Sequence, residues 1–404
     1  MVEHARTITV DLQSEEFECT IKQDTHERVS CFFPNTRGVV EMIAQNGSTV
    51  LLAATGHIRS FIAQRMCEDG KPSSKANLAP ITTKIIAYPT GSAFESDWIV
   101  LERARKVDSD LYTKLNQQNQ RALLVLDPLS YTWRIEDTST LQSRKDELVI
   151  GPILTKKTAR AMGEALDDVF ELCRYPKELA LAPNGTACAY KQMGRCPAAC
   201  DGSEPMHAYQ HRFTEAIQAS THGIVWWKEQ LKLEIANASA AMNFEQAQHT
   251  KRELDQVEKL PLDSLGLAKQ LDRLQCICIT PCVRKGWAIL WRFQSDGLTS
   301  IASVQEQSDG IDMILDSLTS TQESGNQFDQ IEFDQIWLDR FALIARHWMT
   351  KPTRAKRRHV TILDVRDVAQ EKQSHLMICR AIADACVPVD PGHEDEEHTH
   401  IKGA

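Results

Sequence analysis

The sequence predicts an α/β protein of the α+β type, in which small mixed units are joined by a cysteine-rich segment and a helical region. Three observations lead to this prediction. Short β-like runs alternate with amphipathic helical runs near the N-terminus, a Pro, Gly and Cys segment in the middle has no periodicity, and strand-like runs return after a long helical stretch. At 404 residues, 42% hydrophobic and 25% charged, the chain can bury two or three cores.

The N-terminal part carries the clearest turn signal. The dipeptide Asn46-Gly47 is typical of a tight hairpin turn, and it lies between two β-like runs at 38–43 and 49–54. Further elements expected in this half are strands over 7–12, 31–33, 123–126 and 133–136, and helices over 96–115 and 157–172. Beyond residue 267 we expect strands over 276–279, 287–293, 298–304 and 360–365, and helices over 311–318, 336–348 and 375–385.

Composition narrows the class of protein. The sequence has no apolar run long enough to span a bilayer, and residues 1–30 lack the layout of a secretory signal, so we expect a cytoplasmic protein without membrane contact. Lys and Arg number 46 and Asp and Glu number 55, which gives a net charge of −9. Such a protein does not coat nucleic acid by bulk electrostatics, so any contact with DNA is expected to be local.

Four of the twelve cysteines cluster in the sequence. Cys173, Cys188, Cys196 and Cys200 have the spacing C-x14-C-x7-C-x3-C, in a segment too polar to fold by apolar burial alone. In a reducing compartment grouped thiols are more often metal ligands than disulfides, so we expect a tetrahedral metal site or an iron–sulfur cluster. Spacing alone does not choose between zinc and iron, and four unrelated buried cysteines stay an alternative.

A second cysteine group has a different pattern. Cys276, Cys278 and Cys282 are close in sequence, but Cys276 and Cys278 alternate with Ile277 and Ile279 in a strand-like run. Alternation of this kind places both thiols on one face of a strand, so we interpret them as ordinary core residues.

Residues 206–260 predict a helical hairpin. The helical pattern breaks at Met242, where Asn243 is a good N-cap and Gln246 follows at the spacing of a capping box. The two helices share an apolar seam formed by Met242, Phe244, Ala247, Leu254 and Val257. Short amphipathic helices bury little by themselves, so this seam either pairs with a matching hairpin of another protein or packs on its own domain.

These features resemble the UvrC family of excision-repair incision subunits. Gly151-Pro152, the helix leading to Cys173, and the run Gly194 to Gly202 (GRCPAACDG) are similar to the family's central region. The resemblance implies that Cys173, Cys188, Cys196 and Cys200 hold a 4Fe-4S cluster, with zinc as the alternative ligand. Ala187 stands where the family has a proline, a small departure.

The hairpin resembles the family's UVR motif. In that motif a short helical hairpin docks on its counterpart in the helicase subunit UvrB, so the resemblance implies a UvrB-like partner. The residues that it assigns to this contact are Met242, Phe244, Glu245, Ala247, Arg252 and Leu254.

The N-terminal half resembles a degenerate GIY-YIG nuclease domain. Val40 and Leu51 occupy the places of the family's two tyrosines and Phe61 that of its arginine, so only Glu102, the place of the metal-binding glutamate, is retained. A nuclease without its base and phosphate clamp loses most of its catalysis, so we expect neither GIY-YIG cleavage nor a divalent metal at this site. Glu102 is equally explained as a solvated helix residue, and whether the chain is an enzyme stays open.

The sequence pattern and the resemblance together predict six segments and one leading function. The segments are an N-terminal extension over 1–30, a GIY-YIG-like domain over 31–150, a cluster-binding region over 151–205, a helical region with the UVR hairpin over 206–262, a divergent C-terminal α/β domain over 267–386 and a disordered tail over 387–404. The function is a nucleotide excision repair protein that binds UvrB and DNA rather than cutting.

Local DNA contact is expected at one basic run, although a solvated loop explains it as well. Its residues are Arg354, Lys356, Arg357 and Arg358. One alternative function is an active endonuclease that uses the C-terminal carboxylates Asp312, Asp316, Asp329, Asp334, Asp339 and Asp364. Another is an iron–sulfur redox or iron sensor on a UvrC-like scaffold.

Overall fold

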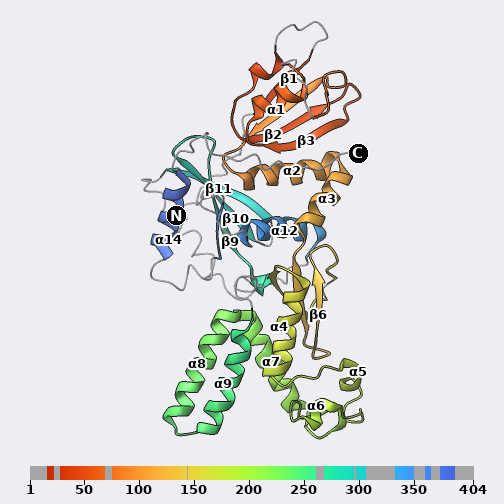
Figure 1. The fold of residues 1–404 in the computed structure, drawn as a ribbon, viewed down its shortest axis with the longest axis vertical. Helices are drawn as coiled ribbons and strands as arrows, with labels where there is room; N and C mark the ends of the chain where they lie inside the picture. The colour runs from red at the N-terminus through yellow and green to blue at the C-terminus, as the bar shows by residue number, and fades with distance from the viewer. Residues whose placement is uncertain are drawn as a thin grey trace, which may run out of the picture. The chain divides into compact units, whose positions relative to one another are not determined.

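The structure is a computed structural model, and it describes residues 16–21, 28–68, 75–142, 144–260, 268–294, 297–305, 333–349, 360–364 and 374–386 (Figure 1). Its helices and antiparallel sheets confirm the predicted α+β class. The chain folds into two compact units. The first unit contains Met1–Gln118, Gln275–Asn326 and Thr350–Ala404, and the second contains Asn119–Leu274 and Gln327–Met349. The six predicted segments are a finer division than these units, and their boundaries stay a prediction.

A four-stranded antiparallel sheet forms the N-terminal part of the first unit. Its order is β1-β4-β2-β3, with β1 at Phe17–Thr20, β4 at Lys84–Pro89, β2 at Gly38–Ile43 and β3 at Thr49–Thr55. The predicted hairpin is β2–β3. In its turn Gly47 has a φ of 81°, and Asn46 Oδ1 accepts the Ser48 N–H at 3.0 Å, as an Asn-Gly turn requires.

Helices pack on both faces of this sheet. Helix α1 (Ile58–Arg65) contributes to one apolar cluster and α2 (Ala93–Val107) to another. Successive strand residues point to opposite faces, so Val40 of β2 belongs to the cluster of α1 whereas Val39 belongs to that of α2. The two helices therefore lie on opposite sides of the sheet (Figure 1).

Two local predictions for this unit were wrong. Residues 31–33 do not form a strand, because Val29–Phe32 is a 3-10 helix held by the bond from the Ser30 N–H to the Glu68 carboxylate at 2.9 Å. The single helix expected over 96–115 is two helices, since Asp108 is extended and its carboxylate accepts the Leu111 N–H at 2.9 Å. This bond caps a new helix, α3, at Ser109–Asn119.

A second antiparallel sheet completes the described part of the first unit. Its order is β11-β10-β9-β12, with β9 at Cys276–Pro281, β10 at Trp287–Gln294, β11 at Gly297–Gln305 and β12 at Thr361–Asp364. Helix α14 (Ser374–Cys386) packs on β9, where Ile277 and Ile279 meet Ile378 and Ile382. Cys276 and Cys278 are fully buried, which agrees with their interpretation as core residues.

The second unit begins with a third antiparallel sheet. Its order is β6-β5-β7-β8, with β5 at Ala122–Asp127, β6 at Thr132–Asp137, β7 at Leu148–Ile153 and β8 at Lys269–Gln270. Helix α4 (Lys156–Val169) lies across it. Gly163 in the middle of α4 faces the Trp133 indole, and a Cβ there would lie 2.7 Å from the ring, so only glycine fits. This close contact explains a residue that costs a helix about 1 kcal/mol.

Three longer helices and one helix distant in the sequence also belong to the second unit. They are α7 (Met206–His222), α8 (Ile224–Ala240), α9 (Phe244–Glu258) and α12 (Gln335–Met349). Gln335 Nε2 of α12 donates to the Thr138 carbonyl at 3.0 Å, and Arg346 Nη1 donates to Asn119 Oδ1 at 3.1 Å. Among the described helices, none combines the length and the apolarity that a membrane crossing requires.

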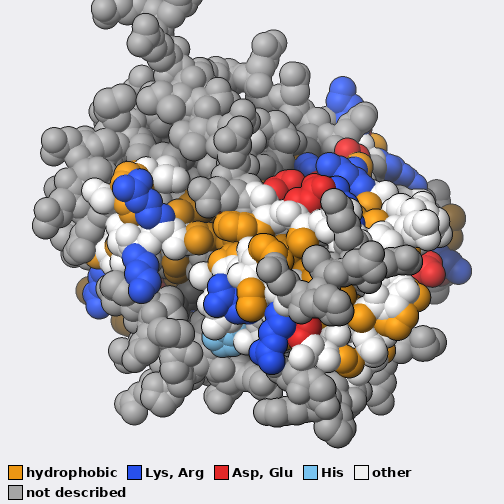
Figure 2. All heavy atoms as spheres, turned by 90° about the horizontal axis from the view of Figure 1, so that it is seen from above, with side chains coloured by type: hydrophobic (Ala, Val, Ile, Leu, Met, Phe, Trp, Pro, Cys, Tyr) orange, Lys and Arg blue, Asp and Glu red, His pale blue; other side chains and the backbone are white. Residues whose placement is uncertain are grey.

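Several expectations fall outside the described residues. They are the strand over 7–12, the helix over 311–318, the basic run with Arg354, Lys356, Arg357 and Arg358, and the tail over 387–404. Figure 2 shows one face of the protein, seen from above relative to Figure 1. Among the side chains described on this face, Lys and Arg lie scattered between hydrophobic groups rather than in one basic patch.

Candidate metal centre

The cysteine segment, residues 173–205, follows α4 and precedes α7. It contains only short helical turns: α5 (Pro176–Leu179), α6 (Ala189–Gln192) and the 3-10 turn Ala199–Asp201. Of its large aliphatic side chains, Leu179 is buried whereas Leu181 and Met193 are more than half exposed. The segment therefore has little apolar core of its own, as the sequence predicts.

The fold brings the four cysteines into one neighbourhood. Each of the six pairs among Cys173, Cys188, Cys196 and Cys200 interacts electrostatically. The Cys196 and Cys200 side chains are buried, and the other two are partly exposed. Within the described residues, however, no three His, Cys, Asp or Glu side chains are already arranged to hold a metal ion. The four thiols are neighbours that would have to draw together around a ligand.

The chemistry of these residues fits a metal or an iron–sulfur cluster. All twelve cysteines are free, so four soft sulfur donors are available. Burial, together with the three neighbouring thiols, raises the pKa of Cys173 to about 11. Burial also raises the pKa of Cys196 and of Cys200. A metal ion reverses this tendency, because a coordinated thiol is deprotonated.

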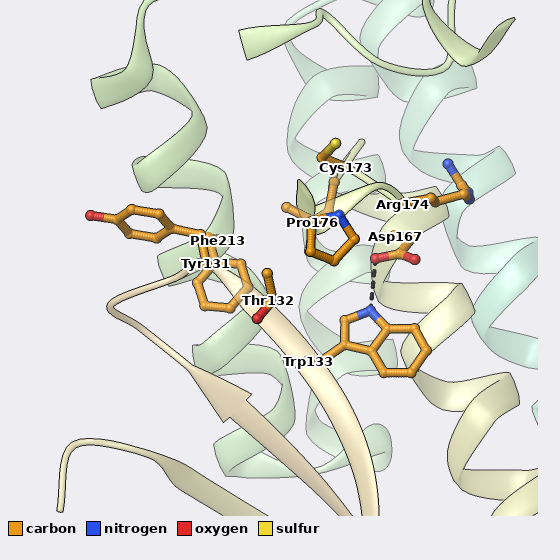
Figure 3. Close-up of a pocket in the computed structure, with 9 residues that line it drawn as sticks. Tyr131, Thr132, Trp133, Asp167, Cys173, Arg174, Pro176 and Phe213 are labelled. Carbon is orange, nitrogen blue, oxygen red and sulfur yellow. Dashed lines mark hydrogen bonds between the residues drawn. The ribbon is translucent and has the colours of Figure 1, made fainter. Parts of the chain in front are cut away.

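A cavity of about 150 Å³ lies beside Cys173 (Figure 3). Asp167 and Trp133 line it, and the Trp133 Nε1–H donates to Asp167 Oδ1 at 2.8 Å. Burial raises the pKa of Asp167 to about 7. The Cys173 sulfur points away from this pair (Figure 3). Asp167 was not a candidate from sequence, because its position in an amphipathic helix gives no sign of its burial.

Helix α7 contacts the start of the cysteine segment directly. The Cys173 N–H donates to the Tyr209 hydroxyl at 3.1 Å, and Arg212 Nε donates to the Phe170 carbonyl at 2.9 Å. Sequence reasoning gave no role to either Tyr209 or Arg212. Neither contact has a local sequence signal, since the partners lie 36 and 42 residues apart.

The predicted hairpin is formed by α8 and α9. Asn243 caps α9 by accepting the Gln246 N–H at 3.3 Å. The reciprocal half of the capping box does not form, because the Asn243 N–H donates to Ala238 O and the Gln246 amide donates to Thr250. At the tip, Met242 and Phe244 are 78% and 68% exposed.

The predicted apolar seam is divided between two surroundings. Met242 and Phe244 lie exposed at the tip together with Glu245, and Ala247 is half-buried beside them. Val257 is fully buried in the core of the second unit, and Leu254 packs against the same core. Arg252 is exposed. Of the residues assigned to a partner contact, Leu254 is therefore largely occupied within the chain.

The GIY-YIG positions do not form a catalytic cluster. Val40, Phe61 and the partly buried Leu51 pack in the apolar cluster of α1. Glu102 lies on α2, on the other side of the sheet, and pairs with Arg105 at 2.9 Å. The two nearby arginines on α1 are also engaged: Arg59 Nε donates to the Phe33 carbonyl, and Arg65 lies over the Phe61 ring.

The described C-terminal carboxylates lie at two different elements, α12 and β12. Asp334 caps α12 by accepting the Trp337 N–H at 2.6 Å, and Asp339 of the same helix accepts a bond from Gln335. Both belong to the second unit, whereas Asp364 ends β12 of the first. Asp312, Asp316 and Asp329 lie outside the described residues.

Comparison with known proteins bears on the second unit. Residues 129–219, from the turn after β5 into α7, match the family model described as UvrC/Cho excinuclease, middle domain. This part of the chain is UvrC-like. The chain is also 23% identical over 232 residues to the UvrABC system protein C of Syntrophotalea carbinolica. That match covers 56% of this chain and 37% of the relative's own length. No solved structure matches the chain.

The UvrC-like middle region contains all four cysteines and Tyr209 but not the hairpin tip or the N-terminal sheet. The comparison thus supports the predicted resemblance to UvrC proteins over the region that contains the four cysteines. The GIY-YIG and UVR assignments stay predictions.

Proposed function

We propose that this UvrC-like protein acts in nucleotide excision repair by binding a UvrB-like helicase subunit and DNA, without GIY-YIG cleavage. The observation that carries the proposal is the gathering of four free cysteines inside the region that matches the UvrC/Cho middle domain. The similarity to a UvrC protein relates the chain to this repair pathway.

In this proposal Cys173, Cys188, Cys196 and Cys200 hold a 4Fe-4S cluster. The cluster would supply the binding energy that orders a segment with almost no apolar core. The cysteine segment would then act structurally, since it joins the sheet and α4 on one side to α7 and the hairpin on the other. Zinc on the same four thiols would give the same structural effect.

The hairpin tip is the proposed contact with the helicase subunit. Met242 and Phe244 are large apolar side chains exposed at the turn between two helices, next to the exposed Glu245, and Arg252 is exposed further along α9. Exposed apolar groups at such a turn gain free energy when a partner covers them. The apolar packing of Val40 and Phe61 supports the part of the proposal that the N-terminal sheet has no GIY-YIG nuclease activity.

Anaerobic purification followed by iron, sulfide and zinc analysis tests the proposal. We expect about four iron and four sulfide per chain, with a broad absorption band near 400 nm that disappears on oxidation. Zinc in place of iron would retain the cysteine site but overturn the cluster. A protein that binds neither metal after reconstitution would overturn the proposal.

A further inference from the structure

Tyr209 of α7 fixes the backbone at the first cysteine. The Tyr209 side chain is fully buried. Its hydroxyl accepts the Cys173 N–H at 3.1 Å and donates to the Tyr131 carbonyl at 3.4 Å. The ring also lies edge-on to the Tyr131 ring, with centroids 6.3 Å apart. The hydroxyl therefore links the amide of a candidate ligand to a strand-end carbonyl in the core of the second unit.

Arg212 lies one turn further along α7 and joins the two ends of the cysteine segment. On the entry side its Nε donates to the Phe170 carbonyl at 2.9 Å and its Nη2 to the Glu171 carbonyl at 3.4 Å. On the exit side its guanidinium forms a two-bond pair with the Glu204 carboxylate, with Nη2 at 2.9 Å from Oε2. Glu204 is itself buried and follows Cys200 by four residues.

The guanidinium also interacts electrostatically with the Cys196 side chain. A bidentate Arg–carboxylate pair holds its geometry better than a lysine can, because two parallel bonds fix the planar group.

We propose that Tyr209 and Arg212, together the α7 clasp, are positioning residues for the cysteine site. The clasp holds the ends of the cysteine segment together before any ligand binds, with the Cys173 backbone fixed by Tyr209. A ligand then has less chain to order, which raises its affinity. This inference rests on the proposed function for its ligand, but the order at Cys173 is a property of the metal-free chain.

Tyr209→Phe is the most direct test, because it removes only the hydroxyl. Tyr131→Phe is its matched control: it also removes one hydroxyl, which accepts from Gln210 Nε2 at 2.7 Å, and leaves the Tyr131 carbonyl in place. In metal-free protein we expect the Cys173 amide to exchange its hydrogen at least about tenfold faster in Tyr209→Phe and at the wild-type rate in Tyr131→Phe. Equal exchange in both variants would overturn the inference.

Cobalt(II) titration, followed by its thiolate absorption, measures the effect on ligand binding. We expect Tyr209→Phe and Arg212→Gln each to weaken cobalt binding by about 10- to 100-fold. Arg212→Lys retains the positive charge, so a reconstituted cluster in this variant should have the wild-type reduction potential. It loses the bidentate pair, so its cobalt affinity should stay as low as that of Arg212→Gln. In Arg212→Gln the potential should become more negative.

Wild-type affinity in Tyr209→Phe and Arg212→Gln would contradict the clasp. If the wild-type chain binds no iron, zinc or cobalt, the proposed function fails, and the amide exchange of metal-free Tyr209→Phe still decides whether the clasp positions Cys173. Should Arg212→Gln fail to fold, Arg212→Lys and Tyr209→Phe carry the same test.

Discussion

The N-terminal sheet and the cysteine segment are stabilised in opposite ways. In the sheet, Val40 and Phe61 stand where the predicted GIY-YIG resemblance expects catalytic groups, and both side chains pack in a closed core. In the cysteine segment four thiols are present, but the apolar core is thin. Burial alone can stabilise a sheet with a closed core, whereas a segment with a thin core depends on what its thiols bind.

The two regions also use charged residues differently. Glu41 is almost fully buried in the N-terminal sheet, and the Arg103 guanidinium donates two bonds to its Oε2 at 3.0 and 2.6 Å. Near the cysteines, Arg212 joins two backbone carbonyls and a carboxylate from both ends of one segment. The Arg103–Glu41 pair joins a helix to the sheet on which it packs. The bonds of Arg212 instead hold together the two ends of a segment that has little apolar core.

The largest expected effect comes from removing a cysteine of the cysteine segment, with a core cysteine of β9 as the control. Cys196→Ala should lose nearly all bound iron or zinc and make residues 173–205 sensitive to proteases, because a tetrahedral site needs its fourth ligand. Cys278→Ala removes a thiol that is also buried, from β9, so it should retain the metal and cost the first unit only about 1 kcal/mol of stability. Metal analysis and limited proteolysis measure both effects. Loss of metal in the Cys278 variant alone would reverse the comparison.

A pH dependence of several kcal/mol is expected in both units, with the same sign. Burial raises the pKa of Glu95 in the first unit, and that of Asp167 in the second, to about 7. The folded state therefore retains these protons where the unfolded chain has lost them. Each unit should lose up to about 3 or 4 kcal/mol as the pH rises from about 4 to 7.

Glu95→Gln and Asp167→Asn separate the two contributions. Each amide oxygen can still accept the bond of the native carboxylate, from the Gly91 N–H or the Trp133 indole. Each variant should flatten the pH dependence of its own unit, measured by hydrogen exchange in β2–β4 or in α4 at pH 5 and pH 8. A wild-type chain whose stability rises over this range would show that the two carboxyls ionise normally.

At the hairpin, the expected effects are of about 1–3 kcal/mol and divide by position. Phe244→Ser should weaken binding to a UvrB-like subunit by about 10- to 100-fold with little change in folding, because the ring is exposed at the tip. Val257→Ala should leave that affinity unchanged but cost about 2 kcal/mol of stability, since Val257 lies in the core. Calorimetric titration and denaturant unfolding check the pair. If Val257→Ala lost affinity for the UvrB-like subunit and Phe244→Ser retained it, the docking surface would be the face of α9 that carries Val257.

The smallest effect is expected at Glu102. Its partly exposed ion pair with Arg105 contributes at most about 0.5 kcal/mol to stability. Glu102→Ala should therefore unfold at nearly the wild-type denaturant concentration. With Mg²⁺ or Mn²⁺ neither protein should nick damaged duplex DNA. Nicking by the wild type that disappears in Glu102→Ala would show that the sheet retains a working site.

Local signals in the sequence predicted much of this structure. The Asn46-Gly47 turn located the β2–β3 hairpin, Asn243 located the start of α9, and the cysteine spacing identified four residues that the fold brings together. Long-range packing was beyond such signals. Strand β4 is buried along most of its length and has no alternation to mark it, and the Tyr209–Cys173 bond joins residues 36 positions apart. The helical period likewise revealed an apolar seam without saying that Val257 packs on its own unit.

The course of the backbone constrains how this molecule can be divided by genetic engineering. Chain from both the middle and the C-terminal third contributes to the second unit, because α12 donates from Gln335 to Thr138 and from Arg346 to Asn119. An expression fragment that stops at Leu274 would retain every cysteine of the UvrC-like region yet expose the surface that α12 covers. Aggregation of such a fragment would reflect a missing helix rather than a defect in metal loading.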